Sequence, residues 1–439
     1  MRQNLENKKV TLLKYGIREI TLVIDRIKQI DPNFVTNPEN IGDPIKKGWL
    51  VPQYVKDLLK TEVQENDLAW GYVHSRGLLS AREFVVSDAR RCYPDSKLQV
   101  DDVVFTNGLG SAIGNIYTVL PSNARVIGPE PSYPTHASLE GFSTGGERIS
   151  YECDPQRGWR INFGDLEKKL QDNHNVTGIL IINPNNPTGA VYPREDLKKV
   201  VELAKKYNLF IIADEIYFRL VYNGETFHHM TAVVNGEVPL IVMRGISKDI
   251  PWPGSRCGWL EFHNFFLDEQ FSTYVNAIKQ RILLEVCATA MPQWILPKLY
   301  IHPEYDKYLD EYKKLLERNS NIIFEILNSI PGLRCNRTDG AFYMMVVFVE
   351  GVLNDSQILD IEHGGIRDYI ETEVAKPGVA LDKRFVYYLL GSTGIVVTPA
   401  SDFYTKHFGF RVTTLEKDEE KLRRTYEKIK ETILKYTNV

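Results

Sequence analysis

Short apolar runs alternate with a helical pattern through the middle of the 439-residue chain, and this alternation restricts the fold more than any other feature. Thr177–Ile182, Leu209–Ala213 and Pro239–Met243 are the apolar runs. Pro193–Asn208, between the first two, has apolar residues at helical spacing. Strands that are apolar along their whole length are typical of a parallel sheet covered by helices on both faces. The pattern therefore predicts an α/β fold with a mostly parallel sheet.

Polar residues follow these runs closely. In open α/β sheets, ligands bind at the carboxyl ends of the strands. The chain places Asn186, Asp214, Tyr217 and Lys248 just beyond three strand ends. We expect these four side chains to converge on one edge of the sheet.

The C-terminal part has a different pattern. Tyr308–Leu327 and Leu415–Tyr436 have the spacing of amphipathic helices, and Gly340–Val349 is typical of a strand. We predict a second, smaller α+β domain that begins near residue 300. The predicted organisation is an N-terminal arm and small-domain segment (1–45), a large domain (46–300) and a C-terminal small domain (301–439).

Composition excludes several kinds of partner. The formal net charge is −4, which gives no basic surface for nucleic acid. No uninterrupted apolar run approaches the roughly 18 residues of a membrane span, and the N-terminus has no signal-peptide pattern. The 5 cysteines are widely spaced without a CxxC pair, which disfavours a disulfide framework or a zinc site. We expect a cytoplasmic protein without nucleic-acid, membrane or metal partners.

Lys248 and Arg256 lie in one loop that is rich in glycine and proline. A lysine at a buried strand end forms a Schiff base when its pKa is lowered by burial and neighbouring cations. A guanidinium fork suits a phosphate. With Asp214 nearby, this combination indicates pyridoxal phosphate. A surface position at the strand end is the simpler interpretation for a lone lysine.

Asp214, Tyr217 and Asn186 support the same interpretation. A carboxylate pairs with a protonated pyridine nitrogen, and a phenol three residues on bonds the 3′ oxygen of the ring. The alternative is a helix N-cap aspartate with a packing tyrosine. Asn186 lies in an Asn-Pro-Asn-Asn-Pro-Thr-Gly string that by itself is typical of a turn, but after a buried strand it aims an amide at a ligand.

The order and spacing of these strings resemble those of the class I and II aminotransferases, which are fold-type-I pyridoxal-phosphate enzymes. The resemblance extends from about Tyr15 to Arg411. It implies a seven-stranded type of mostly parallel sheet in the large domain. It also implies that Lys248, Asp214 and Tyr217 are catalytic, with Lys248 as the Schiff-base lysine that moves the α-proton.

The resemblance also implies the cofactor contacts. Tyr133 would stack on the ring, and backbone N–H groups at the start of a helix would hold the phosphate. Tyr72 would reach the phosphate of the neighbouring subunit, which requires a homodimer with shared active sites. Gly245 replaces the serine found in many members, while Ser247 remains available. The full cofactor set is Tyr72, Gly108, Leu109, Gly110, Ser111, Tyr133, Asn186, Asp214, Tyr217, Ser247, Lys248 and Arg256.

Substrate contacts follow from the same resemblance, which is closest to the alanine-aminotransferase-like branch. Arg411 would form a fork with the substrate α-carboxylate, beside Gly42 and Asn186. Tyr15 and Arg18 resemble a segment that folds over the active site, and Arg18 would bind the distal carboxylate of glutamate or 2-oxoglutarate. A surface or salt-bridging arginine is the alternative for Arg18. The remaining expectation is that four histidines are structural or solvent-facing: His74, His136, His228 and His229.

The predicted function is transfer of an amino group between an L-amino acid (alanine, aspartate or similar) and a 2-oxo acid, expected to be 2-oxoglutarate. The predicted kinetics are ping-pong. One alternative is a lyase of the same fold that resembles aminocyclopropane-carboxylate synthase, because the Ser-Lys-Asp string and the following arginine also occur there. A non-catalytic pyridoxal-phosphate-binding protein is a further alternative. No helix-turn-helix pattern precedes Gly42, which disfavours a DNA-binding regulator.

Overall fold

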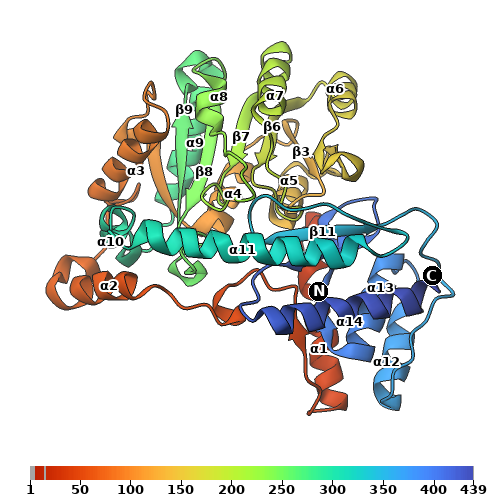
Figure 1. Cartoon of the computed structure of the whole chain (residues 1–439). Helices are drawn as coiled ribbons and strands as arrows, with labels where there is room; N and C mark the ends of the chain where they lie inside the picture. Colours follow the sequence, from red (N-terminus) through yellow and green to blue (C-terminus); the bar gives the residue numbers. More distant parts are fainter. Residues whose placement is uncertain (1–4, 14–15, 439) are drawn as a thin grey trace.

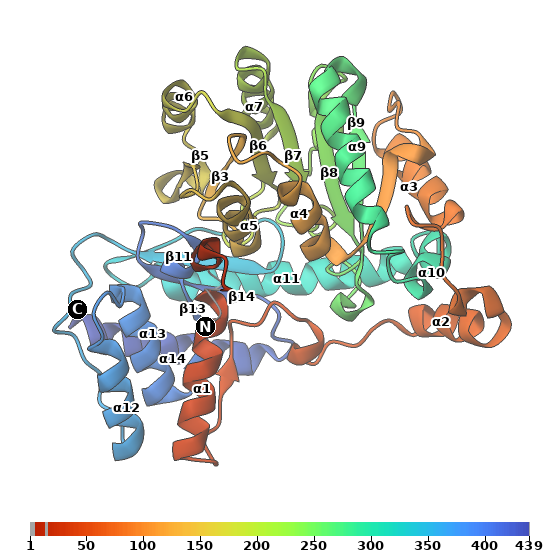
Figure 2. The same cartoon turned by 180° about the vertical axis from the view of Figure 1, so that it is seen from behind.

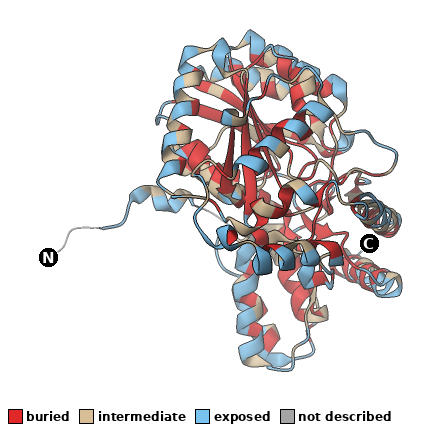
Figure 3. Cartoon of the chain, turned by 90° about the vertical axis from the view of Figure 1, so that its left-hand side faces the viewer, coloured by how far each residue is buried: buried red, intermediate tan, exposed pale blue. Residues whose placement is uncertain are grey.

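The computed structural model describes residues 5–13 and 16–438. A large sheet with helices on both faces forms one part of the molecule, and a smaller sheet with helices forms the other (Figures 1 and 2). The long helix α11 (Tyr305–Asn328) runs between the two parts. Buried residues gather on the strands of the large sheet and on the inner sides of the helices (Figure 3).

The large sheet has eight strands in the order β2-β9-β8-β7-β6-β3-β4-β5. Strand β9 is antiparallel to both of its neighbours, and the two-residue edge strand β5 is antiparallel to β4. The other pairs are parallel, so the predicted α/β class and the parallel majority are confirmed, with β5 as an added edge strand. The strands are β2 (Val103–Asn107), β3 (Arg125–Glu130), β4 (Ser150–Asp154), β5 (Arg160–Ile161), β6 (Val176–Ile182), β7 (Phe210–Asp214), β8 (Leu240–Gly245) and β9 (Cys257–His263).

The helices cover the two faces of this sheet because alternate strand residues point to opposite sides. On one face, Ile179 and Ile211 pack with α6, α7 and α8. On the other face, Leu180 and Ile212 pack with α4 and α9. Helices α2, α3 and α10 pack around the β2 edge. The helix bounds are α2 (Gln53–Glu65), α3 (Leu79–Cys92), α4 (Gly108–Thr118), α5 (Pro134–Thr144), α6 (Phe163–Asp172), α7 (Arg194–Lys206), α8 (Met230–Val234), α9 (Glu269–Leu283) and α10 (Met291–Leu299).

The smaller sheet has the antiparallel order β10-β11-β14-β13, and a separate parallel pair joins β1 to β12. Helix α1 packs through Ile20, Val23 and Ile27 into the core that the C-terminal helices form. The elements are α1 (Glu19–Ile30), α12 (Gly364–Val374), α13 (Leu381–Thr393), α14 (Glu419–Thr437), β1 (Asn37–Pro38), β10 (Leu333–Cys335), β11 (Tyr343–Phe348), β12 (Ile395–Val396), β13 (Thr398–Pro399) and β14 (Gly409–Thr413). Within residues 5–13 and 16–438, none of the helices has the length and apolar character needed to cross a membrane.

Candidate active site

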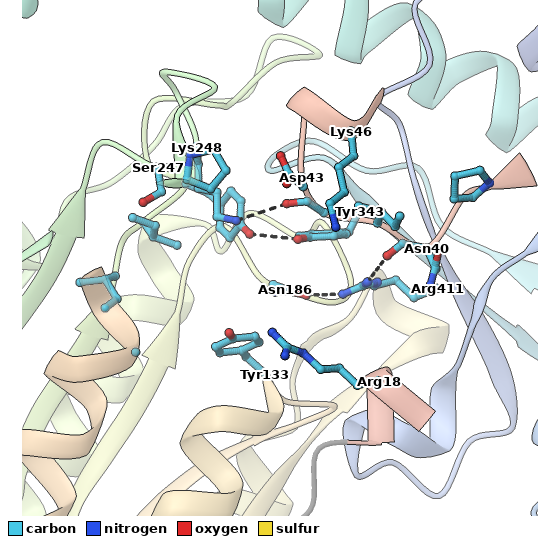
Figure 4. A pocket seen from close by; sticks show the side chains of 18 of the residues that line it. Arg18, Asn40, Asp43, Lys46, Tyr133, Asn186, Ser247, Lys248, Tyr343 and Arg411 are labelled. Carbon is cyan, nitrogen blue, oxygen red and sulfur yellow. Dashed lines mark hydrogen bonds between the residues drawn. The ribbon is translucent and has the colours of Figure 1, made fainter. Parts of the chain in front are cut away.

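A cavity of about 580 Å³ lies where the carboxyl ends of the large-sheet strands face the smaller sheet. Asn186 follows β6, Asp214 ends β7, and Lys248 follows β8; all three line the cavity, together with Tyr217. From the opposite side, β14 contributes Arg411. The cavity therefore joins residues from both parts of the molecule (Figure 4).

Lys248 extends into this cavity. Its Nζ atom donates to the backbone carbonyl of Gly42 at 3.4 Å. The same atom lies 5.7 Å from the ring centroid of Tyr217 and 5.5 Å from that of Phe342. One long hydrogen bond and two aromatic faces hold the ammonium weakly, so the amine is available to a ligand.

Asp214 is buried and bonded on both carboxylate oxygens. Oδ1 accepts the backbone N–H of Ile216 at 3.2 Å, and Oδ2 lies 3.2 Å from Nε2 of His136. Nδ1 of His136 lies 3.2 Å from the Tyr117 hydroxyl. If Nε2 carries the proton, Asp214 accepts it and Nδ1 accepts from Tyr117. This chain fixes the direction of the carboxylate.

His136 is a residue that the sequence interpretation missed as part of the site. It is structural, as expected, but it bonds directly to Asp214 rather than lying apart from the site. It lies three residues after Tyr133, and this helical spacing was the available signal. His229 is half-buried and makes a structural contact, with Nδ1 at 3.4 Å from Oε2 of Glu215.

Tyr217 and Tyr343 meet across the cavity. The Tyr217 hydroxyl donates to the Tyr343 oxygen at 3.3 Å. Burial raises the pKa of Tyr217 well above its ordinary value, and Tyr343 adds to this, while Arg411 acts in the opposite direction. A Cβ on Gly42 would lie 1.9 Å from the Tyr343 oxygen, so only glycine fits there. Tyr343 was not singled out from the sequence, because it lies within an apolar strand pattern.

Arg411 is buried and held from four directions. Nη1 donates to Oδ1 of Asn186 at 3.2 Å, and Nη2 donates to the carbonyl of Asn40 at 2.7 Å. The guanidinium carbon lies 4.3 Å from the ring centroid of Tyr343 and 4.8 Å from that of Phe403. These contacts hold a charged fork toward the cavity (Figure 4).

The start of α4 forms a second polar wall. Gly108 has a φ of +74°, and a Cβ there would lie 2.5 Å from Nη2 of Arg256. Nη2 of Arg256 donates to the carbonyl of Asn107 at 3.2 Å. Leu109 and Gly110 line the cavity. A helix N-terminus beside a guanidinium is a favourable place for a phosphate.

Not every predicted site residue lines the cavity. The Ser111 hydroxyl instead donates to the Glu285 carboxylate at 3.0 Å, so its side chain is occupied elsewhere. Tyr72 is 87% exposed. Tyr15 lies outside the described residues. Ser247, Tyr133 and Gly42 line the cavity. Gly108 does not line it, but it lies against Arg256, which does.

Arg18 reaches the cavity from the short helix Gly16–Arg18, which precedes α1. The next residue anchors this segment: Nζ of Lys383 bonds Oε2 of Glu19 at 2.6 Å and Oδ1 of Asp402 at 3.0 Å. Burial raises the pKa of Asp402 to about 6, against the opposing charge of Lys383. The N-terminal segment is thereby fastened next to the cavity.

A buried ion network lies directly behind Asp214. Glu215 accepts from Nε and Nη2 of Arg244 at 3.0 and 2.7 Å. Nη1 of Arg244 donates to Glu261 at 3.2 Å. Burial raises the pKa of Glu215, but Arg244 and His229 outweigh it and lower the pKa to about 2. The network therefore ties β8 and β9 to the residue that follows β7, next to the site.

Replacing Glu215 by glutamine is expected to lower the free energy of unfolding by about 3 kcal/mol at pH 7, because an Arg244 charge stays buried without its partner. The Glu215 pKa is depressed on folding, so its contribution is present above pH 4.5 and is lost as the pH falls toward 2. Urea unfolding at pH 7 and pH 2.5 measures this. Glu237→Gln, in an exposed pair with Lys205, is the control with little expected change. An equal deficit of Glu215→Gln at pH 7 and at pH 2.5 would contradict the assignment.

Comparison with known proteins agrees with this fold and site. The profile described as "Aminotransferase class I and II" matches residues 44–429. The fold is of the α/β class and the matched family is one of transferases. The chain belongs to the class I and II aminotransferase family. It is an enzyme, an aminotransferase, from a family that uses pyridoxal phosphate.

Several relatives are similar over most of their length. A protein of Methanocaldococcus jannaschii named as an uncharacterised aminotransferase is 42% identical over 421 residues, which cover 96% of each chain. The alanine aminotransferase of Mycobacterium tuberculosis is 31% identical, covering 83% of this chain and 77% of its own. The solved alanine aminotransferase of Pyrococcus furiosus superposes with a TM-score of 0.83 and 26% identity, covering 98% and 99% of the two chains. These relatives do not favour the lyase alternative.

Proposed function

We propose that this aminotransferase uses pyridoxal 5′-phosphate to move an amino group from L-alanine, L-aspartate or a similar amino acid to 2-oxoglutarate, with ping-pong kinetics. The observation that carries the proposal is the convergence of Lys248, Asp214 and Arg411 on one cavity. The alanine-aminotransferase names of similar proteins support the choice of donor.

The residues present fit the cofactor. Gly108 leaves the start of α4 open beside Arg256, which suits the phosphate, and Ser247 lies close by on the cavity wall. Asp214 would pair with the pyridine nitrogen. Tyr217 and Asn186 would bond the 3′ oxygen, and Tyr133 would stack on the ring. Pyridoxal phosphate, when bound, supplies an aldehyde for the amino group and a ring that accepts the electron pair from the α-carbon.

The side chains of the cavity would then have three separate roles. The Lys248 amine, once free, takes the α-proton at Nζ and later returns it, as a general base and acid. His136 and Tyr117 keep the Asp214 carboxylate in one orientation, so its negative charge stays where a protonated ring needs it. Arg411, with Asn186 and the Gly42 backbone, holds the substrate α-carboxylate and so orients the α-carbon toward Lys248.

We also propose that Arg18, together with Tyr15, recognises the distal carboxylate of glutamate and 2-oxoglutarate. Arg18 lines the cavity beside Tyr133 (Figure 4). The fastening of Glu19 to Lys383 supports this, because it fixes the segment that carries Arg18.

We assign residues 46–300 to the cofactor domain, and residues 301–439 with the 1–45 segment to the small domain. A homodimer is proposed in which Tyr72 reaches the partner's phosphate site. Its 87% exposure, beside exposed Leu68 and Trp70, supports a role at an interface. The free cysteines support a cytoplasmic location.

Single-turnover absorbance of the cofactor-loaded protein tests the function. With alanine, aspartate or glutamate alone, the band of lysine-bound cofactor is expected to give way to that of the aminated cofactor, and 2-oxoglutarate should restore it. Recovery of the band without any 2-oxo acid would indicate a lyase instead. If added pyridoxal phosphate gives no such band, the Lys248 assignment is wrong.

A further inference from the structure

Two neighbouring lysines in the short helix Ile45–Lys47 differ completely in environment. Lys47 is buried, and its Nζ atom donates at 2.9 Å both to the carbonyl of Pro38 and to Oε1 of Glu39. Lys46 instead lines the cavity, and Figure 4 shows its side chain extending from this helix toward the side where Arg411 lies. The buried Lys47 holds the turn in place and thereby aims Lys46 at the site.

Within residues 5–13 and 16–438, Lys46 has no ion pair or hydrogen bond through its ammonium group. Asp43 precedes it by three residues, but Oδ1 of Asp43 accepts the backbone N–H of Ile45 at 3.0 Å. An ammonium that faces a cavity with a buried guanidinium is repelled by it, and an anion between the two relieves that repulsion.

The charges that line the cavity are unequal. Among the residues that the structure describes, the cationic side chains are Arg18, Lys46, Lys248, Arg256 and Arg411, and the carboxylates are Asp43 and Asp214. In the proposed function, Lys248, Arg256 and Asp214 face the cofactor, and Arg411 faces the α-carboxylate. Arg18, Lys46 and Asp43 are left on the substrate side. Their sum is positive, which favours a second negative charge on the substrate.

We propose that Lys46 is a specificity-determining residue that attracts the distal carboxylate of dicarboxylic substrates such as glutamate and 2-oxoglutarate. The proposal rests on the proposed function and adds to it a second cation. Figure 4 shows Lys46 on one side of the Asn186–Arg411 pair and Arg18, beside Tyr133, on the other. Lys46 therefore acts through the positive potential that it adds to the substrate side of the cavity, and not through a shared contact with the carboxylate that Arg18 would hold. A lysine suits this role, because its flexible stem places a point charge without demanding a fixed geometry.

The test compares Lys46→Met with Lys46→Arg, and uses Lys56→Met on the exposed side of α2 as the matched control. Half-reactions of the cofactor-loaded enzyme are followed with glutamate and 2-oxoglutarate, and with alanine and pyruvate. Lys46→Met is expected to lower kcat/KM about fivefold for the diacids and to leave the monoacids unchanged, because only the diacids carry the extra charge. Lys46→Arg should keep most of the preference, and Lys56→Met all of it.

Binding of an unreactive diacid gives a readout that does not depend on turnover. Titration of the cofactor-loaded protein with glutarate, and with butyrate as the monoacid, should show that Lys46→Met weakens glutarate binding by a similar factor and leaves butyrate binding unchanged. Equal losses for both acids, or no loss for either, would overturn the proposal. If the variants keep the alanine half-reaction, the proposed function holds whatever the result for Lys46. If the unmodified enzyme fails with every amino acid, the proposed function itself is refuted.

Discussion

Replacing Lys248 by alanine is expected to lower kcat by at least about a thousandfold for every amino acid, because the change removes the group that moves the α-proton in the proposed function. The effect is expected on turnover and not on folding. The Lys248 ammonium has one long hydrogen bond, 3.4 Å to the Gly42 carbonyl, so its loss costs the folded state little. Steady-state kinetics and thermal unfolding of the same preparations measure the two effects separately.

A covalent readout makes this prediction sharper. Borohydride reduction of the cofactor-loaded enzyme should fix the cofactor on the peptide that contains Lys248, and Lys248→Ala should not be labelled there. Lys56→Ala, on the exposed side of α2, is the control and should be labelled and active like the unmodified enzyme. Turnover of Lys248→Ala within tenfold of normal, or labelling at another lysine, would show that the mechanism is wrong.

The strand-end half of the cavity could be predicted from the sequence because its signals are local. Apolar runs mark the buried strands β6, β7 and β8, and their observed bounds differ from the predicted ones by one or two residues. The polar residues that follow parallel strands must lie at one edge of the sheet. The positions of these polar residues just after the apolar runs were therefore enough to place them at the cavity.

The opposite half of the cavity could not be predicted in this way. Asn40 accepts from Arg411 across 371 residues, and Tyr217 meets Tyr343 across 126. The strands that bring Asn40 close, β1 and β12, have two residues each and carry no periodicity. Tyr343 lies in an apolar run where a core tyrosine and a site tyrosine look alike.

Charged residues posed a related difficulty. Lys46 and Lys47 together resemble a solvated pair, yet the structure buries the second against Glu39 and leaves the first exposed at the wall of the cavity. Burial of a lysine depends on a partner that supplies the opposite charge, and that partner is determined by tertiary structure. Only the three-dimensional arrangement separates the two lysines.

Replacing Arg411 by lysine is expected to lower kcat/KM by about thirtyfold or more for monoacids and diacids alike, mainly through KM. Lysine keeps the positive charge but cannot form a fork with both carboxylate oxygens, so an Arg-to-Lys change is not conservative at such a site. Loss of one partner of a buried, hydrogen-bonded charge pair costs about 2–5 kcal/mol. The α-carboxylate is present in the ground state and in the transition state. Loss of the guanidinium fork therefore weakens the binding of both states equally, and this raises KM.

Arg411→Lys also distinguishes the two ends of the substrate. The α-carboxylate is common to all amino acids, so alanine and glutamate should lose the same factor, unlike the selective effect expected of Lys46→Met. Arg424→Lys, on the exposed side of α14, is the matched control and should leave kcat/KM unchanged. A loss confined to diacids would move Arg411 to the distal carboxylate. Its hydrogen bonds to Asn186 and Asn40 argue against that, because the proposed function places the α-carboxylate at Arg411, Asn186 and the Gly42 backbone, and Nζ of Lys248 donates to the Gly42 carbonyl.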